Sequence, residues 1–162
     1  MSFYYSYDTA LGTIIITESR GFITGLFLPG QLLSEGEGFK EYDLRETPLI
    51  RETHRQLTEY LAGNRKVFDV PLNPEGTEFQ KRVWSELLKI PYGTSCSYGE
   101  IAGRLGIPKG PRAVGLANNR NPIAIIVPCH RVIGADKGLV GYGGGLHLKK
   151  ALLDLEGIGY KE

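Results

Sequence analysis

The sequence predicts an α+β protein in two parts. Residues 1–70 form a small β-sheet with a helix, 71–75 a linker, and 76–162 a mostly helical winged helix-turn-helix part. Two observations carry this prediction. β-rich runs separated by turn residues fill the start of the chain, and after residue 76 apolar residues recur at helical spacing, with two short helices joined by a turn that contains glycine.

The first part begins with three β-rich runs, over residues 3–7, 12–18 and 22–27, which predict a small antiparallel meander. Residues 30–38 are rich in Gly and Glu and predict a loop. The carboxylates in and after this loop are interpreted as a solvated surface. They are Glu35, Glu37, Glu41 and Asp43.

The end of the first part combines a helix with a last strand. Thr47 before Pro48 has the residue types of a helix N-cap and first turn, and predicts a helix to about Leu61. The apolar ends of residues 67–70 then indicate a final strand.

The second part opens with a helix capped by Thr77. Its apolar positions follow a helical period, which favours a core position for Trp84 over a role in stacking on a ligand. These positions are Phe79, Val83, Trp84, Leu87 and Leu88.

A helix-turn-helix follows, with a first helix over residues 97–105 and a second, DNA-reading helix over 111–119. Ala113 and Gly115 on the second helix are small, which suits either close approach to DNA or close packing on a neighbouring helix. Lys109 and Arg120 flank this helix and suit contacts with phosphates.

Composition limits the classes of function. The net charge is +1, with 7 Lys and Arg against 10 Asp and Glu in residues 1–74, and 12 against 8 in residues 75–162. The basic surface is therefore expected on the second part, as DNA binding requires. The chain has only two cysteines, which predicts a protein of the reducing cytoplasm. It has no apolar run of the ~20 residues that a bilayer requires, which predicts that it has no membrane role. We expect a monomer.

The candidate chemistry lies at Cys129 and His130, with Glu156 before a glycine that stops a helix. A thiol, an imidazole and an orienting carboxylate are the parts of an activated sulfur nucleophile. The alternative is a buried thiol beside a histidine that satisfies a core hydrogen bond. Because adjacent side chains on a strand point to opposite faces, Cys129 and His130 can cooperate only from a tight turn or through a water.

A series of motifs decides between these interpretations. The chain is similar to the O6-alkylguanine-DNA alkyltransferases, which transfer an alkyl group from damaged guanine to a cysteine. The motifs are GTEFQKRVW, IPYGTSCSYGEIA, RAVGLANNRNP, VPCHRVI, GYGGG and LLDLE, in register between Gly76 and Glu156.

The resemblance implies a role for each matching residue. Cys129 is the alkyl acceptor, His130 the water-linked base and Glu156 the carboxylate that orients it. Asn121 braces the turn before the cysteine, and Arg112 enters the base stack. Tyr98 faces the flipped base, whose pocket includes the residues Val132, Tyr142 and Gly143.

The resemblance also implies a ribonuclease H-like first domain and alkylated duplex DNA as the partner. No cofactor is expected. The glycine-rich residues 134–145, the expected wing, lack the spacing of phosphate-binding loops, and two cysteines exclude a Cys-rich zinc site.

The predicted reaction flips O6-alkylguanine out of the duplex and moves the alkyl group irreversibly to Cys129. Lowering a thiol pKa from ~8.5 to about 6 raises the thiolate fraction at pH 7 roughly thirtyfold. The same fall in pKa makes the thiolate less nucleophilic, by about tenfold. Alignment of the reacting atoms must therefore supply most of the rate.

The competing functions are a non-catalytic protein that binds alkylated DNA and a winged-helix transcriptional regulator.

Overall fold

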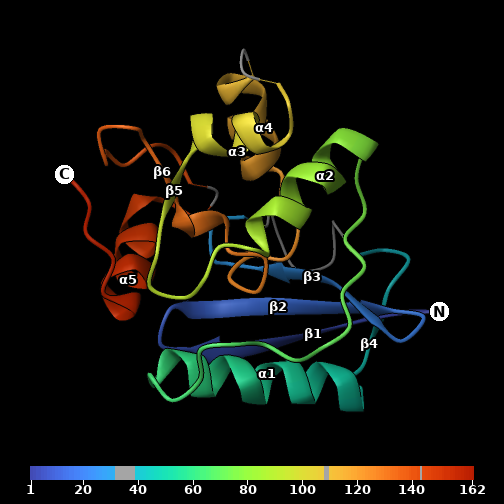
Figure 1. Ribbon diagram of the computed structural model, residues 1–162. Helices are drawn as coiled ribbons and strands as arrows, with labels where there is room; N and C mark the ends of the chain where they lie inside the picture. Colours follow the sequence, from blue (N-terminus) through green and yellow to red (C-terminus); the bar gives the residue numbers. More distant parts are fainter. Residues whose placement is uncertain (32–38, 108–109, 143) are drawn as a thin grey trace. The chain divides into compact units, whose positions relative to one another are not determined.

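The computed structural model describes residues 1–31, 39–107, 110–142 and 144–162 (Figure 1). Two predicted site residues, Lys109 and Gly143, lie outside this described part. The chain divides into two compact units, Met1–Glu75 and Gly76–Glu162. Among the described residues, no helix has the length and apolar character that crossing a membrane requires.

The first unit is built on a four-stranded sheet in the order β3-β2-β1-β4. The predicted antiparallel meander is confirmed. Its strands are β1 (Ser2–Thr9), β2 (Gly12–Ser19) and β3 (Phe22–Phe27). The fourth strand, β4 (Asp43–Leu44), was not predicted and runs parallel to β1. It is only two residues long and both are exposed, so its sequence has no strand pattern.

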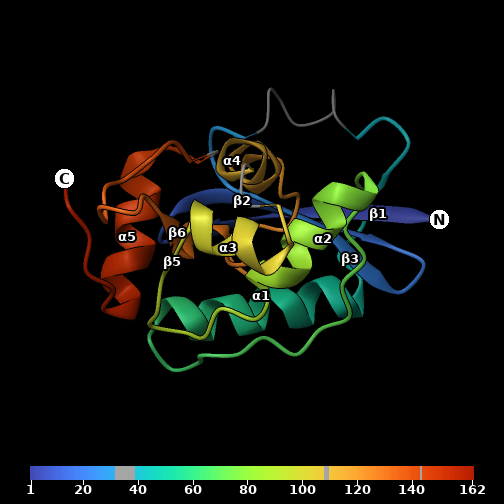
Figure 2. The same cartoon turned by 45° about the horizontal axis from the view of Figure 1, so that its top comes forward.

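Helix α1 (Pro48–Leu61) begins where the sequence predicts. Thr47 Oγ1 accepts a hydrogen bond from the Ile50 N–H at 3.1 Å, which satisfies a donor that the first turn leaves open. The helix lies along the sheet formed by β1, β2 and β3 (Figure 2). Its buried residues Ile50, Leu57 and Tyr60 supply the core on this side.

The strand predicted over residues 67–70 is wrong. The backbone of Asp69 is hydrogen-bonded to the side chain of Gln56 on α1 instead of to a neighbouring strand. The Asp69 N–H donates to Gln56 Oε1 at 2.8 Å, and Gln56 Nε2 donates to the Asp69 carbonyl at 3.2 Å. The β-type pairing occurs two residues later, where Leu72 pairs with Ile23 of β3. Part of the predicted linker is therefore hydrogen-bonded to the sheet of the first unit.

The second unit starts with α2 (Glu78–Leu87), which has a complete capping box between Thr77 and Gln80. Trp84 is 2% exposed, and its Nε1 donates to the Ala117 carbonyl at 2.9 Å. The expected core role of Trp84 is thereby confirmed, with an added hydrogen bond that ties α2 to the end of the helix-turn-helix.

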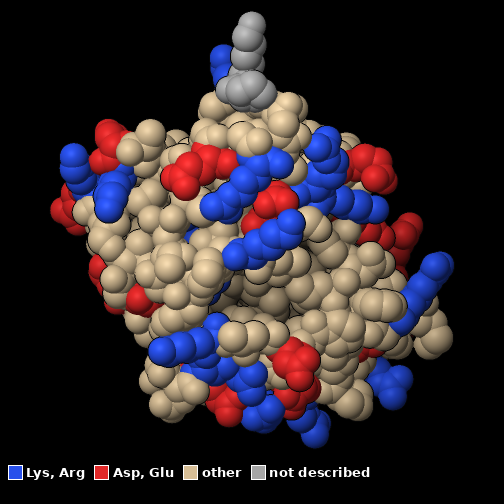
Figure 3. All heavy atoms as spheres, in the orientation of Figure 1, with Lys and Arg blue, Asp and Glu red and all other residues tan. Residues whose placement is uncertain are grey.

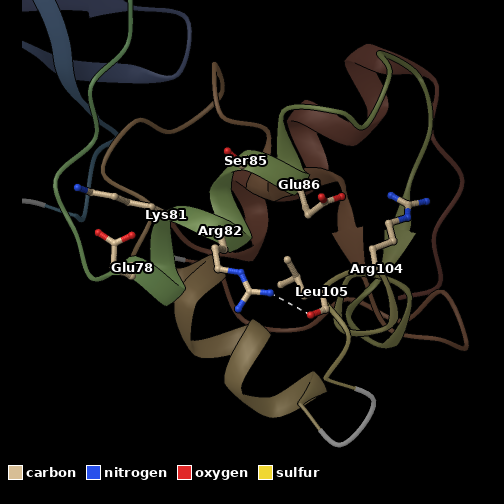
Figure 4. Close-up of a pocket in the computed structure, with 7 residues that line it drawn as sticks. All are labelled: Glu78, Lys81, Arg82, Ser85, Glu86, Arg104 and Leu105. Atoms are coloured by element: carbon tan, nitrogen blue, oxygen red, sulfur yellow. Dashed lines mark hydrogen bonds between the residues drawn. The ribbon is translucent and has the colours of Figure 1, made fainter.

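The helix-turn-helix consists of α3 (Tyr98–Arg104) and α4 (Pro111–Asn119). Figure 2 shows α4 almost along its axis, with α3 beside it. A polar hollow lies between α2 and the end of α3 (Figure 4). There Arg82 Nη2 donates to the Leu105 carbonyl at 3.0 Å, so α2 also holds the turn between the two helices.

Two short elements and one helix complete this unit. Strand β5 (Cys96–Ser97) pairs in parallel with β6 (Val132–Ile133), which follows the candidate nucleophile. In the described part of the expected wing, residues 135–137 form a turn and Gly138 pairs with Lys161 in an isolated β-bridge. Helix α5 (Leu146–Glu156) stops at Gly157, whose φ of 73° is the left-handed value that favours glycine after a helix.

Candidate active site and nucleic-acid interface

Asn121 organises the segment that leads to Cys129. Its Nδ2 donates to the carbonyls of Val127 at 2.8 Å and Ile123 at 3.3 Å, and its Oδ1 accepts from the Ile123 N–H at 3.0 Å. Within this segment Ile125 has a φ of 72°, a strained value for a β-branched residue. The three hydrogen bonds of one buried side chain hold this strained loop closed, so Asn121 lies where the sequence predicts a brace.

Cys129 and His130 lie in a 3-10 turn, Cys129–Arg131. This is the tight turn that adjacent residues need in order to act together. Cys129 is buried, and burial raises the pKa of its thiol above the usual value. Hydrogen bonds with the side chains of Asn121 and Tyr142, and then the charge of Lys149, act in the opposite direction. The thiol therefore stays protonated in the free protein and needs a base when it reacts.

His130 is fully buried, with Nε2 2.6 Å from Glu156 Oε2. Arg131 holds the same carboxylate through Nε at 2.8 Å and Nη2 at 3.1 Å, and the Gly93 N–H donates to Oε1 at 3.0 Å. A carboxylate that accepts these bonds is an acceptor for His130 too, so we place the imidazole hydrogen on Nε2. Nδ1 is then free to accept a proton. Burial lowers the pKa of His130, against the raising effect of Glu156, so the ring is neutral at rest and its Nδ1 lone pair is available.

Lys149 is a buried cation beside this group. Its Nζ donates to the Val132 carbonyl at 2.7 Å and to the Val140 carbonyl at 3.3 Å, and lies 6.0 Å from the ring centroid of Tyr142. Burial lowers the pKa of Lys149 to about 8. The lysine thus connects the strand after Cys129 to the glycine-rich loop and places positive charge near the sulfur.

Three of the predicted DNA-facing residues line one pocket of about 380 Å³. The pocket is lined by Tyr98, Pro111, Arg112, Gly115, Leu116, Asn119 and Val140. Its wall is mainly apolar, and Leu116 and Val140 are exposed. Burial, followed by the interaction with Cys129, raises the pKa of Tyr98 to about 12, so its phenol remains a proton donor at neutral pH. The pocket combines an apolar surface for a flat ring with a donor and a cation.

Glycine at position 115 is not required by packing within the protein. A Cβ atom added there would come no closer than 3.7 Å to Tyr98 Cδ1, an ordinary contact. Gly115 also lies inside α4, where glycine destabilises a helix relative to alanine. Packing of α4 on Tyr98 therefore does not by itself require glycine at this position.

The remaining predicted residues lie on the same unit. Ala113 and Arg120 are exposed on α4 and at its end, whereas the side chain of Val132 is fully buried in β6. Over α2 and α3, positive and negative side chains are interspersed (Figure 3). Among the described residues of that face, the Lys and Arg side chains are separated by Asp and Glu side chains rather than joined in one basic patch.

The comparisons with known proteins agree with this geometry. The family described as 6-O-methylguanine DNA methyltransferase, DNA binding domain, matches residues 78–158, and its ribonuclease-like domain matches residues 2–74. A methylated-DNA--protein-cysteine methyltransferase of Bacillus subtilis (strain 168), the constitutive one, is 47% identical over the whole chain and 99% of its own length. The chain belongs to the 6-O-methylguanine DNA methyltransferase family.

Further relatives of the methyltransferase family cover both units. The methylated-DNA--protein-cysteine methyltransferase of Methanosarcina acetivorans is 50% identical over 96% of this chain and 98% of its own. The crystal structure of Mycobacterium tuberculosis OGT in complex with DNA superposes with a TM-score of 0.86 at 46% identity. That match covers 94% of this chain and 91% of the other. The predicted α+β class with a ribonuclease-like first domain is therefore confirmed.

Sequence reasoning missed three side chains at the site of this methyltransferase. They are Asn118, Arg131 and Lys149. Lys149 shares a helix face with Leu152 and Leu153, at spacings of 3 and 4, and with the site residue Glu156 at a spacing of 7, and this spacing was a signal that the lysine is buried.

Proposed function

We propose that this protein repairs alkylated DNA by transferring the alkyl group from O6-alkylguanine, mainly O6-methylguanine, to Cys129. The observation that carries the proposal is a buried thiol in a tight turn, next to an imidazole whose other nitrogen bonds a carboxylate. The membership of the family and the DNA complex of a relative support it. The partner is alkylated duplex DNA, and we propose that the protein acts as a monomer in a reducing cytoplasm, where its two free cysteines stay reduced.

The lesion must leave the base stack to reach a buried sulfur. Arg112 lines the pocket beside Tyr98, and its planar guanidinium can fill the gap by stacking on the neighbouring bases. Gly115 leaves room on α4 for the nucleic-acid backbone. Lys109, Ala113 and Arg120 are proposed as contacts with the phosphate backbone and sugars around this point.

The transfer forms a bond from sulfur to the alkyl carbon and breaks the bond from that carbon to the guanine oxygen. The thiol proton passes to His130 Nδ1 through a water, and Glu156 stabilises the resulting imidazolium. Guanine leaves with the electron pair and takes a proton from the Tyr98 phenol, which the raised pKa keeps protonated. Tyr142 and Val132 line the approach to the sulfur in this proposal, and Gly143, which lies outside the described residues, keeps its pocket role as an expectation from the family resemblance.

The product is a thioether, which has no good leaving group at neutral pH. The protein therefore acts once per molecule, as a stoichiometric acceptor.

The alternative function, binding alkylated DNA without chemistry, does not need a thiol between a base and two hydrogen-bonding side chains. A winged-helix regulator does not need one either. Incubation with duplex DNA carrying a labelled O6-methyl group separates these functions, because only the acceptor becomes labelled.

Replacing Arg112 with alanine is expected to slow repair of duplex DNA much more than reaction with free O6-alkylguanine base. The free base needs no flipping, so only the duplex reaction uses the side chain that fills the gap. Single-turnover rates on the two substrates measure this difference. Equal slowing on both substrates by a folded variant would remove Arg112 from this role, and with it the assignment of α4 as the DNA-reading helix.

Replacing Gly115 with alanine is expected to raise stability by about 0.5–1 kcal/mol and to weaken DNA binding. The added methyl group fits against Tyr98, and we expect it to occupy space that the bound DNA needs. Thermal unfolding and titration of a labelled duplex measure the two effects. The matched control is Gly103→Ala on α3, where an added Cβ meets nothing within 4 Å. A variant that gains stability and binds DNA as well as the unmodified protein would contradict close approach at position 115.

A further inference from the structure

Two buried acceptors lie next to the Cys129–His130 peptide without a hydrogen-bond donor among the residues that the structure describes. They are Asn118 Oδ1 and His130 Nδ1. Asn118 is 1% exposed in the last turn of α4, and His130 is 0% exposed. Buried polar atoms are nearly always paired with protein or with ordered water, so each of these two atoms calls for a donor that no described residue supplies.

The orientation of the Asn118 amide is fixed by its other atom. Nδ2 donates to the Cys129 carbonyl at 3.3 Å. Rotating the amide by half a turn would place two oxygens against each other, so Oδ1 is the atom without a donor. The His130 ring is fixed in the same way, because Nε2 bonds Glu156 and leaves the lone pair on Nδ1.

The other groups around the sulfur cannot accept its proton. Asn121 Oδ1 already accepts from the Ile123 N–H, and the Asn121 side chain acts on Cys129 in the direction that lowers the thiol pKa, as a donor does. The Lys149 ammonium donates to backbone carbonyls, and Tyr98 keeps its proton because its pKa is about 12. Tyr142 acts on Cys129 as a hydrogen-bond donor that lowers the pKa of the thiol. Asn118 and His130 are the acceptors left among the described side chains that adjoin the Cys129 peptide.

We propose that Asn118 is a positioning residue which, together with His130, holds one buried water at Cys129. The water donates one hydrogen to Asn118 Oδ1 and the other to His130 Nδ1, and accepts the hydrogen of the thiol. This arrangement satisfies both buried acceptors with the two hydrogens of a single molecule. The inference rests on the proposed function only in taking Cys129 as the nucleophile.

The proton movement balances within this group. The thiol proton passes to the water oxygen while the water passes its own proton to His130 Nδ1, which leaves a thiolate, an imidazolium and an intact water. The water then donates to the thiolate sulfur and still donates to Asn118 Oδ1. Asn118 thus keeps the same bond before and after the transfer, so the water stays in place while its other hydrogen changes partner.

The test replaces Asn118 with leucine, which has a similar volume and no acceptor. The measured quantity is the rate of Cys129 alkylation by iodoacetamide against pH, with the adduct located by peptide mass. The thiol pKa is expected to rise by about one unit, which lowers the thiolate fraction at neutral pH roughly tenfold. The variant and the unmodified protein should react at equal rates above both pKa values. Gln56→Leu, which removes a buried amide from the first unit, is the control and should leave the titration unchanged.

Two other results of this titration would overturn the proposal. A fall in the thiol pKa would mean that Asn118 accepts directly from the thiol and stabilises its protonated form. An unchanged pKa with slower reaction at every pH would mean that Asn118 only shapes the turn. Iodoacetamide requires no DNA, so failure of the unmodified protein to accept a methyl group would overturn the proposed function and leave this titration interpretable.

If the Asn118→Leu variant fails to fold, a measurement on the unmodified protein tests the proposal instead. A high-resolution crystal structure of the unmodified protein is expected to show an ordered water within hydrogen-bond distance of both Asn118 Oδ1 and His130 Nδ1. A water that contacts His130 without reaching Asn118, or no ordered water between them, would contradict the assignment.

Discussion

Replacing Cys129 with serine is expected to abolish methyl transfer, down to the level of the reaction without protein. A serine hydroxyl is far less acidic than a thiol, so the weakly basic, buried His130 cannot ionise it appreciably. The variant should fold and bind duplex DNA, because the sulfur is not part of the pocket formed by α3, α4 and Val140. Single-turnover transfer from a labelled duplex and a binding titration measure the two properties.

Cys96 supplies the matched control. It is the other thiol of the chain and is also buried, but it lies in β5, paired with Val132. Cys96→Ala should keep full transfer. Transfer that survives Cys129→Ser but disappears in Cys96→Ala would reverse the assignment of the acceptor.

Replacing Glu156 with glutamine is expected to slow transfer and to destabilise the second unit by about 3–5 kcal/mol, as removing one member of a buried ion pair does. The carboxylate bonds both His130 and Arg131, and its loss leaves a buried guanidinium without its counter-charge. His130 also loses the group that stabilises its imidazolium. Thermal unfolding and single-turnover rates at pH ~6 to 9, where His and Cys titrate, measure the two effects.

The control for this charge removal is Glu59→Gln on α1. Glu59 pairs with Arg55 and Arg65, but its side chain is 38% exposed, so the cost should stay within about 1 kcal/mol and transfer should be unchanged. Should Glu156→Gln match the unmodified protein in rate across the whole pH range, Glu156 would have a structural role alone.

Local signals in the sequence were sufficient for most of the fold. Thr47, Thr77 and Gly157 mark helix ends through interactions within one turn, and the structure has helix boundaries at each of them. The strand predicted at residues 67–70 failed because its partner was a side chain on α1, a contact between residues 13 apart. Strand β4 was missed because its two residues depend on pairing with β1 rather than on their own pattern.

The same distinction separates the predicted and the missed parts of the site. Cys129, His130 and Glu156 have side chains whose chemistry is specific enough to predict their roles. Arg131 and Lys149 are residue types that are normally exposed, and their burial is explained by hydrogen bonds to distant residues. Arg131 donates to Glu156 and the Ile90 carbonyl, and Lys149 donates to the carbonyls of Val132 and Val140. Asn118 was missed because its role depends on which peptide lies beside the end of α4.

The central claim is that Cys129 takes the alkyl group once and keeps it. The most direct test incubates the protein with an excess of duplex DNA that carries O6-methylguanine and follows both the restored guanine and the intact mass of the protein. We predict a plateau at one guanine restored per protein molecule, with a single added methyl group located on Cys129 by peptide mapping. A methyl group on Cys96, or continued repair beyond one equivalent, would contradict the account.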